Sequence, residues 1–181
     1  MPNPPERFAT ERLTARPPRV EDADRIFESY AGDPAVTRYL SWRTHENAGS
    51  VAEFLRGQAE AWAKPGNGAH RAWLLETAGD RLPAGTIGVT IEGGKALFGY
   101  ALARRCWGRG LAAEALRWLV TWSLEQPEIY RAWAYCDVEN AGSARVMEKA
   151  GMQREGLLRR WHLCPNLGQE LRDCWVYAKA R

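Results

Sequence analysis

The sequence predicts a single mixed α/β domain whose mostly antiparallel central sheet has about six to seven strands and is flanked by about four helices. Three strand-like runs follow one another and are separated by tight-turn residues, which is typical of an antiparallel meander. A helical pattern then leads to a further strand, and such a crossover implies a parallel step. The chain has 181 residues, of which 45% are apolar and 26% charged, as expected for one globular domain.

The first third of the chain is expected to form one short strand and two helices. Residues 12–16 alternate apolar and polar side chains, as a strand does. Residues 21–31 repeat apolar side chains at helical spacing and begin with acidic residues, which favours an amphipathic helix. A second amphipathic helix is expected to start at a capping box formed by Ser50 and Glu53 and to stop at Pro65 and Gly66.

The rest of the sheet is expected to come from strand-like runs that are bounded by turn residues or helices. Gly79, and Gly93 with Gly94, provide the tight turns of the meander. A crossover helix is expected at residues 111–124, and a further helix at 141–150 ends at Gly151, since glycine suits the left-handed conformation of helix ends. The expected strands are residues 70–77, 84–91, 97–102, 131–136, about 152–159 and 170–178.

Composition and charge argue against several classes of protein. The net charge of +3 is small and the basic residues are dispersed, so no nucleic-acid partner is expected. No apolar run approaches the ~18 residues of a membrane span, and the first residues lack a secretory signal, so we expect a cytoplasmic protein without membrane attachment. Residues 1–7 contain three prolines and are expected to form a flexible tail. The scattered cysteines and histidines predict neither a disulfide nor a metal site.

One loop carries an anion-binding pattern. The strand at residues 97–102 runs into the helix at 111–124 through a segment in which Gly108 and Gly110 are two residues apart. The start of such a helix has backbone N–H groups without partners, its dipole favours negative charge, and glycine allows a phosphate to approach the backbone. Arginines at positions 104, 105 and 109 flank the glycines. The pattern favours a pyrophosphate site, although a simple turn with solvated arginines has the same local appearance.

The loop resembles the acyl-CoA pyrophosphate loop of the GNAT superfamily of N-acetyltransferases. In that loop, Arg or Gln is followed by Gly three positions later and by Gly or Ala two positions after that, as in Arg105, Gly108 and Gly110. Residues 10–23 and 140–156 are similar to two further signatures of the RimJ/RimL branch, which includes ribosomal-protein N-terminal acetyltransferases. Motifs in register across roughly residues 8–178 are more specific than one glycine loop.

The resemblance implies a GNAT fold with a splayed strand pair at the acyl-CoA site, with acetyl-CoA as donor and CoA as product. Exposed main-chain groups of the splayed strand would bind the pantetheine arm. Asn140 could bind pantetheine, cap the following helix, or do both. The implied acyl-CoA site comprises Tyr100, Ala101, Leu102, Ala103, Arg105, Cys106, Trp107, Gly108, Arg109, Gly110, Leu111, Ala112, Asn140 and Ser143.

The implied mechanism is direct attack of an amine on the thioester, which requires the protein to handle protons. Many members of the family supply a tyrosine as acid, but Met147 occupies that position here. Ser143 resembles the serine proposed as acid in the Rim-type branch, and its alternative role is that of a first-turn serine bonded to backbone. Glu92 is the expected base, although a glutamate beside a hairpin is often only exposed. Lesser candidates for proton handling are Tyr100, Glu76 and Asp137.

The acceptor amine is expected to enter from the opposite mouth of the sheet. The favoured acceptor is the α-amino group of a protein or peptide, and a small amine such as an aminoglycoside, polyamine or amino acid is the alternative. Loss of the family tyrosine also leaves open a non-catalytic acyl-CoA-binding regulatory module. Homodimerisation is expected from the habit of the family. Candidate acceptor-site residues are Tyr39, Trp42, Trp161 and His162.

Overall fold

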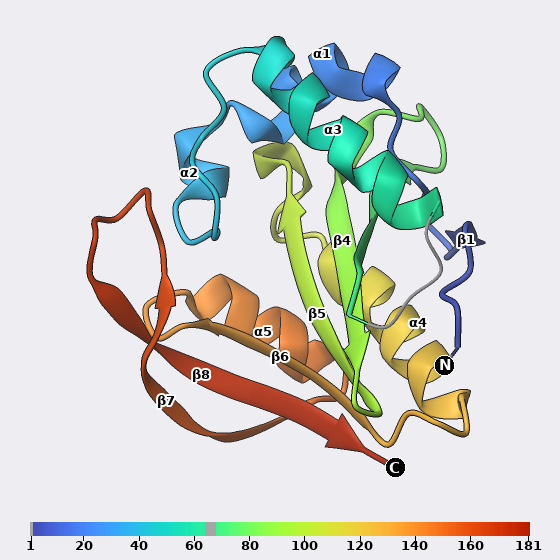
Figure 1. The fold of residues 1–181 in the computed structure, drawn as a ribbon, viewed down its shortest axis with the longest axis vertical. Coiled ribbons are helices and arrows are strands. Elements are labelled where there is room, and N and C mark those ends of the chain that lie inside the picture. The colour runs from blue at the N-terminus through green and yellow to red at the C-terminus, as the bar shows by residue number, and fades with distance from the viewer. Residues whose placement is uncertain (1, 64–67) are drawn as a thin grey trace.

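An eight-stranded sheet forms the centre of the protein in the computed structural model, which describes residues 2–63 and 68–181 (Figure 1). The strand order is β1-β2-β3-β4-β5-β6-β8-β7; β5 pairs with β6 in parallel and the other neighbours are antiparallel. The meander and the parallel crossover are therefore confirmed. The strands are β1 (Phe8–Ala9), β2 (Leu13–Arg16), β3 (His70–Thr77), β4 (Pro83–Glu92), β5 (Lys95–Leu102), β6 (Arg131–Asp137), β7 (Gln153–Leu163) and β8 (Leu171–Ala180).

Two strands differ from the expectation. The short strand β1 was not predicted, because two residues are too few to give an alternating pattern, and it pairs with Thr14 and Ala15 of β2. β7 continues beyond the expected end at residue 159. Its pairing with β8 is irregular between Leu158 and His162, and Arg160 there has a φ of 47°. The irregularity interrupts the sequence pattern without ending the strand.

The helical segment before the meander is broken, whereas one continuous helix was expected at residues 21–31. It consists of a 3₁₀ turn, η1 (Val20–Asp22), then α1 (Ala23–Ile26) and a π-helical segment, η2 (Phe27–Ala31). Apolar spacing over so few residues does not separate these helix types. The unpredicted α2 (Pro34–Thr37) follows, with the Oδ1 of Asp33 accepting a hydrogen bond from the Ala35 N–H at 2.9 Å.

The next helix, α3 (Ala48–Ala63), starts two residues before the predicted capping box. The Oδ1 of Asn47 accepts a hydrogen bond from the Ser50 N–H at 3.0 Å, and the Ser50 hydroxyl donates to the Asn47 carbonyl at 2.8 Å. Asn47 is therefore the cap and Ser50 lies inside the first turn, so the predicted cap was wrong. The predicted stop at Pro65 and Gly66 lies outside the described residues.

Two helices follow the meander. α4 (Leu111–Glu125) is the crossover between β5 and β6, and α5 (Ala141–Lys149) follows β6. In Figure 1, α3 crosses in front of the upper part of β4, whereas α4 lies behind the strands, so helices cover both faces of the meander. No helix in the described ranges is both long and apolar enough to cross a membrane.

Aromatic side chains join the start of the chain to the core. Trp73 on β3 is fully buried, and its indole N–H donates to the Pro5 carbonyl at 3.0 Å. Phe8 stacks on Trp118 of α4, with ring centroids 4.3 Å apart, and meets Trp73 edge-on at 5.6 Å. The end of the segment expected to be a tail is thus held against the sheet.

β5 and β6 separate along their length, as the family resemblance implied. Within the described strands, they pair through Lys95 with Arg131, Ala96 with Ala132, and Leu97 with Trp133, and not beyond. In contrast, every residue of β5 pairs with a residue of β4. Backbone polar groups on the β6 side of β5 beyond Leu97 therefore have no ladder partner in β6. The splayed pair positions the candidate site.

Candidate functional site

In the described part of the chain, three neighbouring cavities lie around the point where β5 and β6 separate. The largest, which we call the acyl groove, has a volume of about 520 Å³ and lies between the glycine loop, the start of α4 and α5. The central cavity, of about 270 Å³, adjoins it at Tyr100, Asn140 and Ser143. The side cavity, of about 250 Å³, adjoins the central cavity at His70, Gly99 and Tyr100. Tyr100 lines all three.

The N-terminus of α4 opens into the acyl groove. Gly108 and Gly110 have φ values of 74° and 78°, in the left-handed region that favours glycine. The Glu114 N–H donates to the Gly110 carbonyl at 3.0 Å, so the N–H groups of residues 111–113 precede the helical ladder. Both glycines and residues 111–113 line the groove. The structure thus brings the predicted glycines and the open end of the helix to one anion-binding surface.

Two of the loop arginines point away from this surface. Arg105 donates to the Ser29 hydroxyl at 2.7 Å and to the Pro83 carbonyl at 2.6 Å. The Nε of Arg104 donates to the carboxylate of Asp33 at 3.0 Å. Neither arginine lines the acyl groove. Arg105 and Arg104 therefore tie the loop to the segments around η2 and β4, and the predicted role of Arg105 as a direct ligand has no geometric support.

Positive charge in the groove comes from α5 instead. Arg145 and Lys149 are four residues apart, so they share one face of the helix, and both line the groove. Sequence reasoning missed both residues, although their spacing after Asn140 was a usable signal. Other predicted residues of the site also line the groove: Ala101, Leu102, Cys106, Trp107, Leu111 and Ala112.

Arg12 fastens the loop from outside the groove. Its Nε donates to Glu114 Oε2 at 2.7 Å, its backbone N–H donates to Oε1 at 3.0 Å, and its Nη1 donates to the Arg109 carbonyl at 2.9 Å. Burial opposes the ionisation of Glu114, but hydrogen bonds from Thr10 and Arg12 outweigh it, and the pKa of Glu114 is lowered. Glu114 is therefore an ionised anchor for the loop.

A tyrosine and a serine meet where the acyl groove joins the central cavity. The Oη of Tyr100 lies 2.7 Å from the Oγ of Ser143 and donates to the Ser143 carbonyl at 3.1 Å. The Oδ1 of Asn140 accepts a hydrogen bond from the Ser143 N–H at 3.0 Å, so Asn140 caps α5 and fixes the serine. Met147, one turn further on, is fully buried and has no proton to give.

Burial keeps both Tyr100 and the nearby Cys136 protonated and uncharged at neutral pH. Burial raises the pKa of Tyr100 more than its hydrogen bond with Ser143 lowers it, so the phenol stays protonated at neutral pH. Cys136 lines the central cavity, and burial raises the pKa of its thiol to about 11. The thiol is therefore a poor nucleophile at neutral pH. Proton donation is the chemistry that Tyr100 and Ser143 can provide.

Two histidines, His70 and His162, line the central cavity. The Nδ1 of His162 lies 3.3 Å from the Tyr135 hydroxyl, and that of His70 lies 3.2 Å from the Thr90 hydroxyl. Burial lowers the pKa of both, although Asp137 opposes the shift of His162. Each ring is neutral near pH 7 and can accept a proton. A lone histidine at a strand end gave no sequence signal for His70.

Glu92, the expected base, is not close to this pair. It is exposed at the β4–β5 hairpin, where it is in register with Lys95. Tyr100 is in register with Ile87, five residues before Glu92 on β4. At ~3.4 Å per residue, Glu92 lies about 17 Å along the strand from the level of Tyr100. Its alternative role as an exposed hairpin residue fits this position.

The lesser carboxylate candidates already have partners. Glu76 accepts a hydrogen bond from the Nε of Arg16 at 3.2 Å. Asp137 is buried and pairs with Arg172, whose Nη2 lies 3.2 Å from its Oδ1. Both carboxylates are thus engaged by arginine side chains. These ion pairs hold β3 against β2 and β6 against β8.

The four predicted acceptor-site residues separate into two groups. Tyr39 lines both the acyl groove and the central cavity, Trp42 lines the side cavity, and His162 lines the central cavity. Trp161 is 49% exposed on β7 and lines none of these three cavities. It meets Tyr135 edge-on, with ring centroids 6.2 Å apart. Trp161 therefore borders the site through Tyr135 rather than forming its wall.

A split sheet with an open helix N-terminus beside the split is the arrangement that an acyl-CoA-dependent acyltransferase needs to bind its donor. Residues 12–153 match the acetyltransferase (GNAT) domain family. The chain belongs to this family and is an acyltransferase that uses acetyl-CoA, as the motifs implied. It is 31% identical over 157 residues to the uncharacterized N-acetyltransferase p20 of Bacillus licheniformis. The matched residues cover 85% of this chain and 86% of that relative.

Solved structures share the whole fold. The microcin self-immunity acetyltransferase MccE, in complex with acetyl-CoA and AMP, superposes with a TM-score of 0.82 at 18% identity, over 95% of this chain and 94% of that one. RimL, a ribosomal-protein α-N-acetyltransferase in complex with coenzyme A, gives a TM-score of 0.80 at 18% identity, over 96% of each chain. The likeness to the RimJ/RimL branch is thus supported at the level of the fold.

Proposed function

We propose that the protein transfers the acetyl group of acetyl-CoA to a primary amine by direct attack, and that Tyr100 and Ser143 supply the proton for the leaving thiolate. The amine nitrogen attacks the thioester carbonyl, the carbon–sulfur bond breaks, and CoA leaves as the thiol. The observation that carries the proposal is the 2.7 Å contact between Tyr100 Oη and Ser143 Oγ at the junction of the acyl groove and the central cavity.

The acyl groove fits acetyl-CoA with its pyrophosphate at the start of α4. The N–H groups of residues 111–113 favour an anion there, and Arg145 and Lys149 add positive charge. The unpaired backbone of β5 offers hydrogen bonds to the pantetheine arm. Asn140 uses its Oδ1 for capping, which leaves its Nδ2 able to donate to the same arm.

In the proposed proton relay, the Ser143 hydroxyl donates to the departing sulfur and the Tyr100 hydroxyl replaces the serine proton. Tyr100 then regains a proton from water. Because its pKa is raised, the Tyr100 phenol keeps its proton at neutral pH and can donate it. Tyr100 reaches the site from β5, whereas the helix position that holds a tyrosine in many relatives is the buried Met147. A strand residue thus takes over a role that the helix does not fill.

The amine must lose a proton, and His70 or His162 is the proposed acceptor. We expect kcat/KM to rise with pH along an acid limb whose midpoint lies below the ordinary histidine pKa of 6.5, because burial lowers the pKa of both rings. Initial rates of His70→Gln and His162→Gln are measured from pH 5 upward. The histidine whose variant loses the acid limb is the base. An unchanged limb in both single variants would rule out both histidines.

Arg12→Ala is expected to raise the KM for acetyl-CoA about three- to tenfold while kcat stays within about twofold, because the anchor of the glycine loop is lost and the reacting groups are untouched. Arg12→Lys keeps the charge without the forked geometry and should give an intermediate KM. Steady-state kinetics at saturating amine measure both constants. A fall in kcat at unchanged KM would contradict the anchoring role.

For the acceptor, we propose the α-amino group of a protein or peptide first and a small amine second. Neighbours of the same fold act on a ribosomal protein, in RimL, or serve in microcin self-immunity, in MccE. The test measures CoA release and the addition of one acetyl group by mass spectrometry, with peptides, amino-acid amides and polyamines as acceptors. Tight acetyl-CoA binding without turnover on any amine would favour a non-catalytic acyl-CoA-binding module instead.

A further inference from the structure

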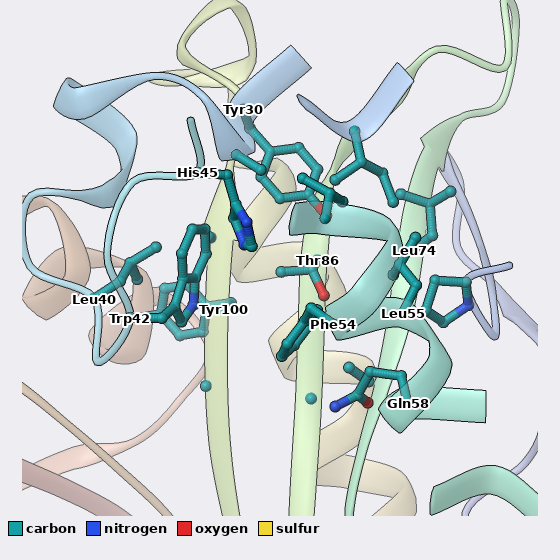
Figure 2. A pocket seen from close by; sticks show the side chains of 18 of the residues that line it. Tyr30, Leu40, Trp42, His45, Phe54, Leu55, Gln58, Leu74, Thr86 and Tyr100 are labelled. Atoms are coloured by element: carbon teal, nitrogen blue, oxygen red, sulfur yellow. The ribbon is translucent and has the colours of Figure 1, made fainter. Parts of the chain in front are cut away.

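Building on the proposed acetyl transfer, we infer that the side cavity binds an uncharged aromatic ring of the acceptor, so that the acceptor is a primary amine carrying a phenol- or indole-like group. The cavity lies between α3 and η2 on one side and β3 to β5 on the other (Figure 2). It adjoins the central cavity at Tyr100 and Gly99. A group bound there lies beside the proposed site of transfer.

The floor of the side cavity contains an unfilled position on the sheet. Gly88 and Gly99 are paired across β4 and β5. A Cβ on Gly99 would meet no atom within 4 Å, whereas a Cβ on Gly88 would lie 2.5 Å from the His70 ring. The ring of His70 therefore occupies the space above one glycine, and the space above the other is open. Glycine in the middle of a strand is typical where a ligand approaches the backbone closely.

The walls of the cavity are aromatic and uncharged. Trp42, His45 and Phe54 form a row, with ring centroids 5.3 Å apart between the first two and 6.3 Å apart between the last two. Figure 2 shows Trp42 and His45 side by side, Phe54 across from them on α3, and Tyr100 behind Trp42. None of the described residues lining the cavity is Asp, Glu, Lys or Arg. Such a site disfavours a polyamine or an aminoglycoside, because burying unpaired charges is costly.

A buried amide provides the polar contact. Gln58 on α3 is 8% exposed and lines the cavity, and its Oε1 has no hydrogen-bond partner among the described residues. Figure 2 shows its side chain directed toward the same space. A buried carbonyl without a partner calls for a donor, which a phenol or an indole carries. Thr86, by contrast, already donates to the Trp73 carbonyl at 3.0 Å.

His45 offers a second acceptor. Its Nδ1 lies 2.9 Å from the Ser50 hydroxyl, which itself donates to the Asn47 carbonyl. The hydrogen between them therefore belongs to His45 Nδ1, and Nε2 of the neutral ring is left as an acceptor. The size also fits, since a cavity of about 150 Å³ holds benzene. The about 250 Å³ found here admits one substituted or bicyclic ring.

The test compares amines that differ in one feature, using CoA release at saturating acetyl-CoA. Tyramine and tryptamine are expected to exceed hexylamine and spermidine in kcat/KM by about tenfold or more, and tyramine should exceed phenethylamine because of its hydroxyl donor. Gln58→Leu should erase the preference for tyramine over phenethylamine. Gly99→Val should lower kcat/KM for the aromatic amines about tenfold or more with an unchanged acetyl-CoA Kd. Gly57→Ala is the control for Gln58→Leu, because Gly57 is exposed on the same helix, α3.

A second comparison of acceptors decides whether the ring belongs to a peptide or to a small amine. A dipeptide amide that begins with tyrosine presents the same ring on a peptide α-amine. If its kcat/KM exceeds that of tyramine, the acceptor is a peptide. If tyramine has the higher kcat/KM, the acceptor is a small amine. Preference for spermidine, or rates for aromatic amines that Gly99→Val and Gln58→Leu leave unchanged, would overturn the inference but not acetyl transfer. If no amine reacts, the proposed function fails. Calorimetric titration of tyramine into the CoA-saturated protein then decides the cavity: binding weakened by Gly99→Val supports it, and absence of binding overturns it.

Discussion

Gly108→Glu is expected to lower the affinity for acetyl-CoA at least about 100-fold, which corresponds to about 2.8 kcal/mol of binding free energy. Gly108 lies at the open start of α4, where the groove is built for negative charge, and a carboxylate there would repel the pyrophosphate and occupy its place. Isothermal titration with acetyl-CoA and with CoA measures the loss.

The control for this variant is Gly108→Ala. Both substitutions place a side chain on a backbone with a φ of 74°, so both carry the same left-handed strain. No atom lies within 4 Å of the added Cβ, so alanine has room, and only glutamate adds charge. We expect the alanine variant to lose far less affinity. Equal losses in the two variants would show that strain, rather than the charge at the helix start, controls binding.

Ser143→Ala is expected to lower kcat about 100-fold, and Tyr100→Phe about tenfold, with little change in the KM for acetyl-CoA. Ser143 is placed to give its proton to sulfur directly, whereas Tyr100 acts through it. For the same reason, the double variant should be scarcely slower than Ser143→Ala alone, because Tyr100 has no route to the sulfur once the serine hydroxyl is gone. Steady-state and single-turnover rates at one pH test all three.

Tyr130→Phe is the matched control for Tyr100→Phe. Tyr130 is 49% exposed, and its hydroxyl donates to the Gly93 carbonyl at 2.9 Å, near the hairpin at the far end of β5. We expect this variant to keep the wild-type kcat. If Ser143→Ala and Tyr100→Phe also keep it, the proton relay is wrong even though the acyl groove stands. Multiplicative losses would show instead that the two hydroxyls act independently.

Most of the fold follows from patterns that span several residues. The meander and the crossover helix were predictable because strand-like runs bounded by turn residues, and apolar side chains at helical spacing, each extend over several residues. The elements that were missed, β1 and α2, have two and four residues and give no period to read. The cap of α3 was misassigned because Asn47 and Ser50 are both good caps, and only the hydrogen-bond geometry separates them.

The candidate site was predictable where backbone dictates it and less so where side chains do. Gly108 and Gly110 are required by their positive φ values, so their spacing carries the anion site. The direction of Arg105 depends on Ser29 and Pro83, which are distant in sequence. The contact between Tyr100 and Ser143 joins a strand to a helix that lies 43 residues further on, and no local pattern reveals it.

The crystal structure of the protein with CoA tests the account most directly. We expect the pyrophosphate at the N–H groups of residues 111–113, the pantetheine arm between β5 and β6, and the sulfur within hydrogen-bonding distance of Ser143 Oγ. A pyrophosphate bound away from the start of α4, or a sulfur remote from Ser143 and Tyr100, would contradict it.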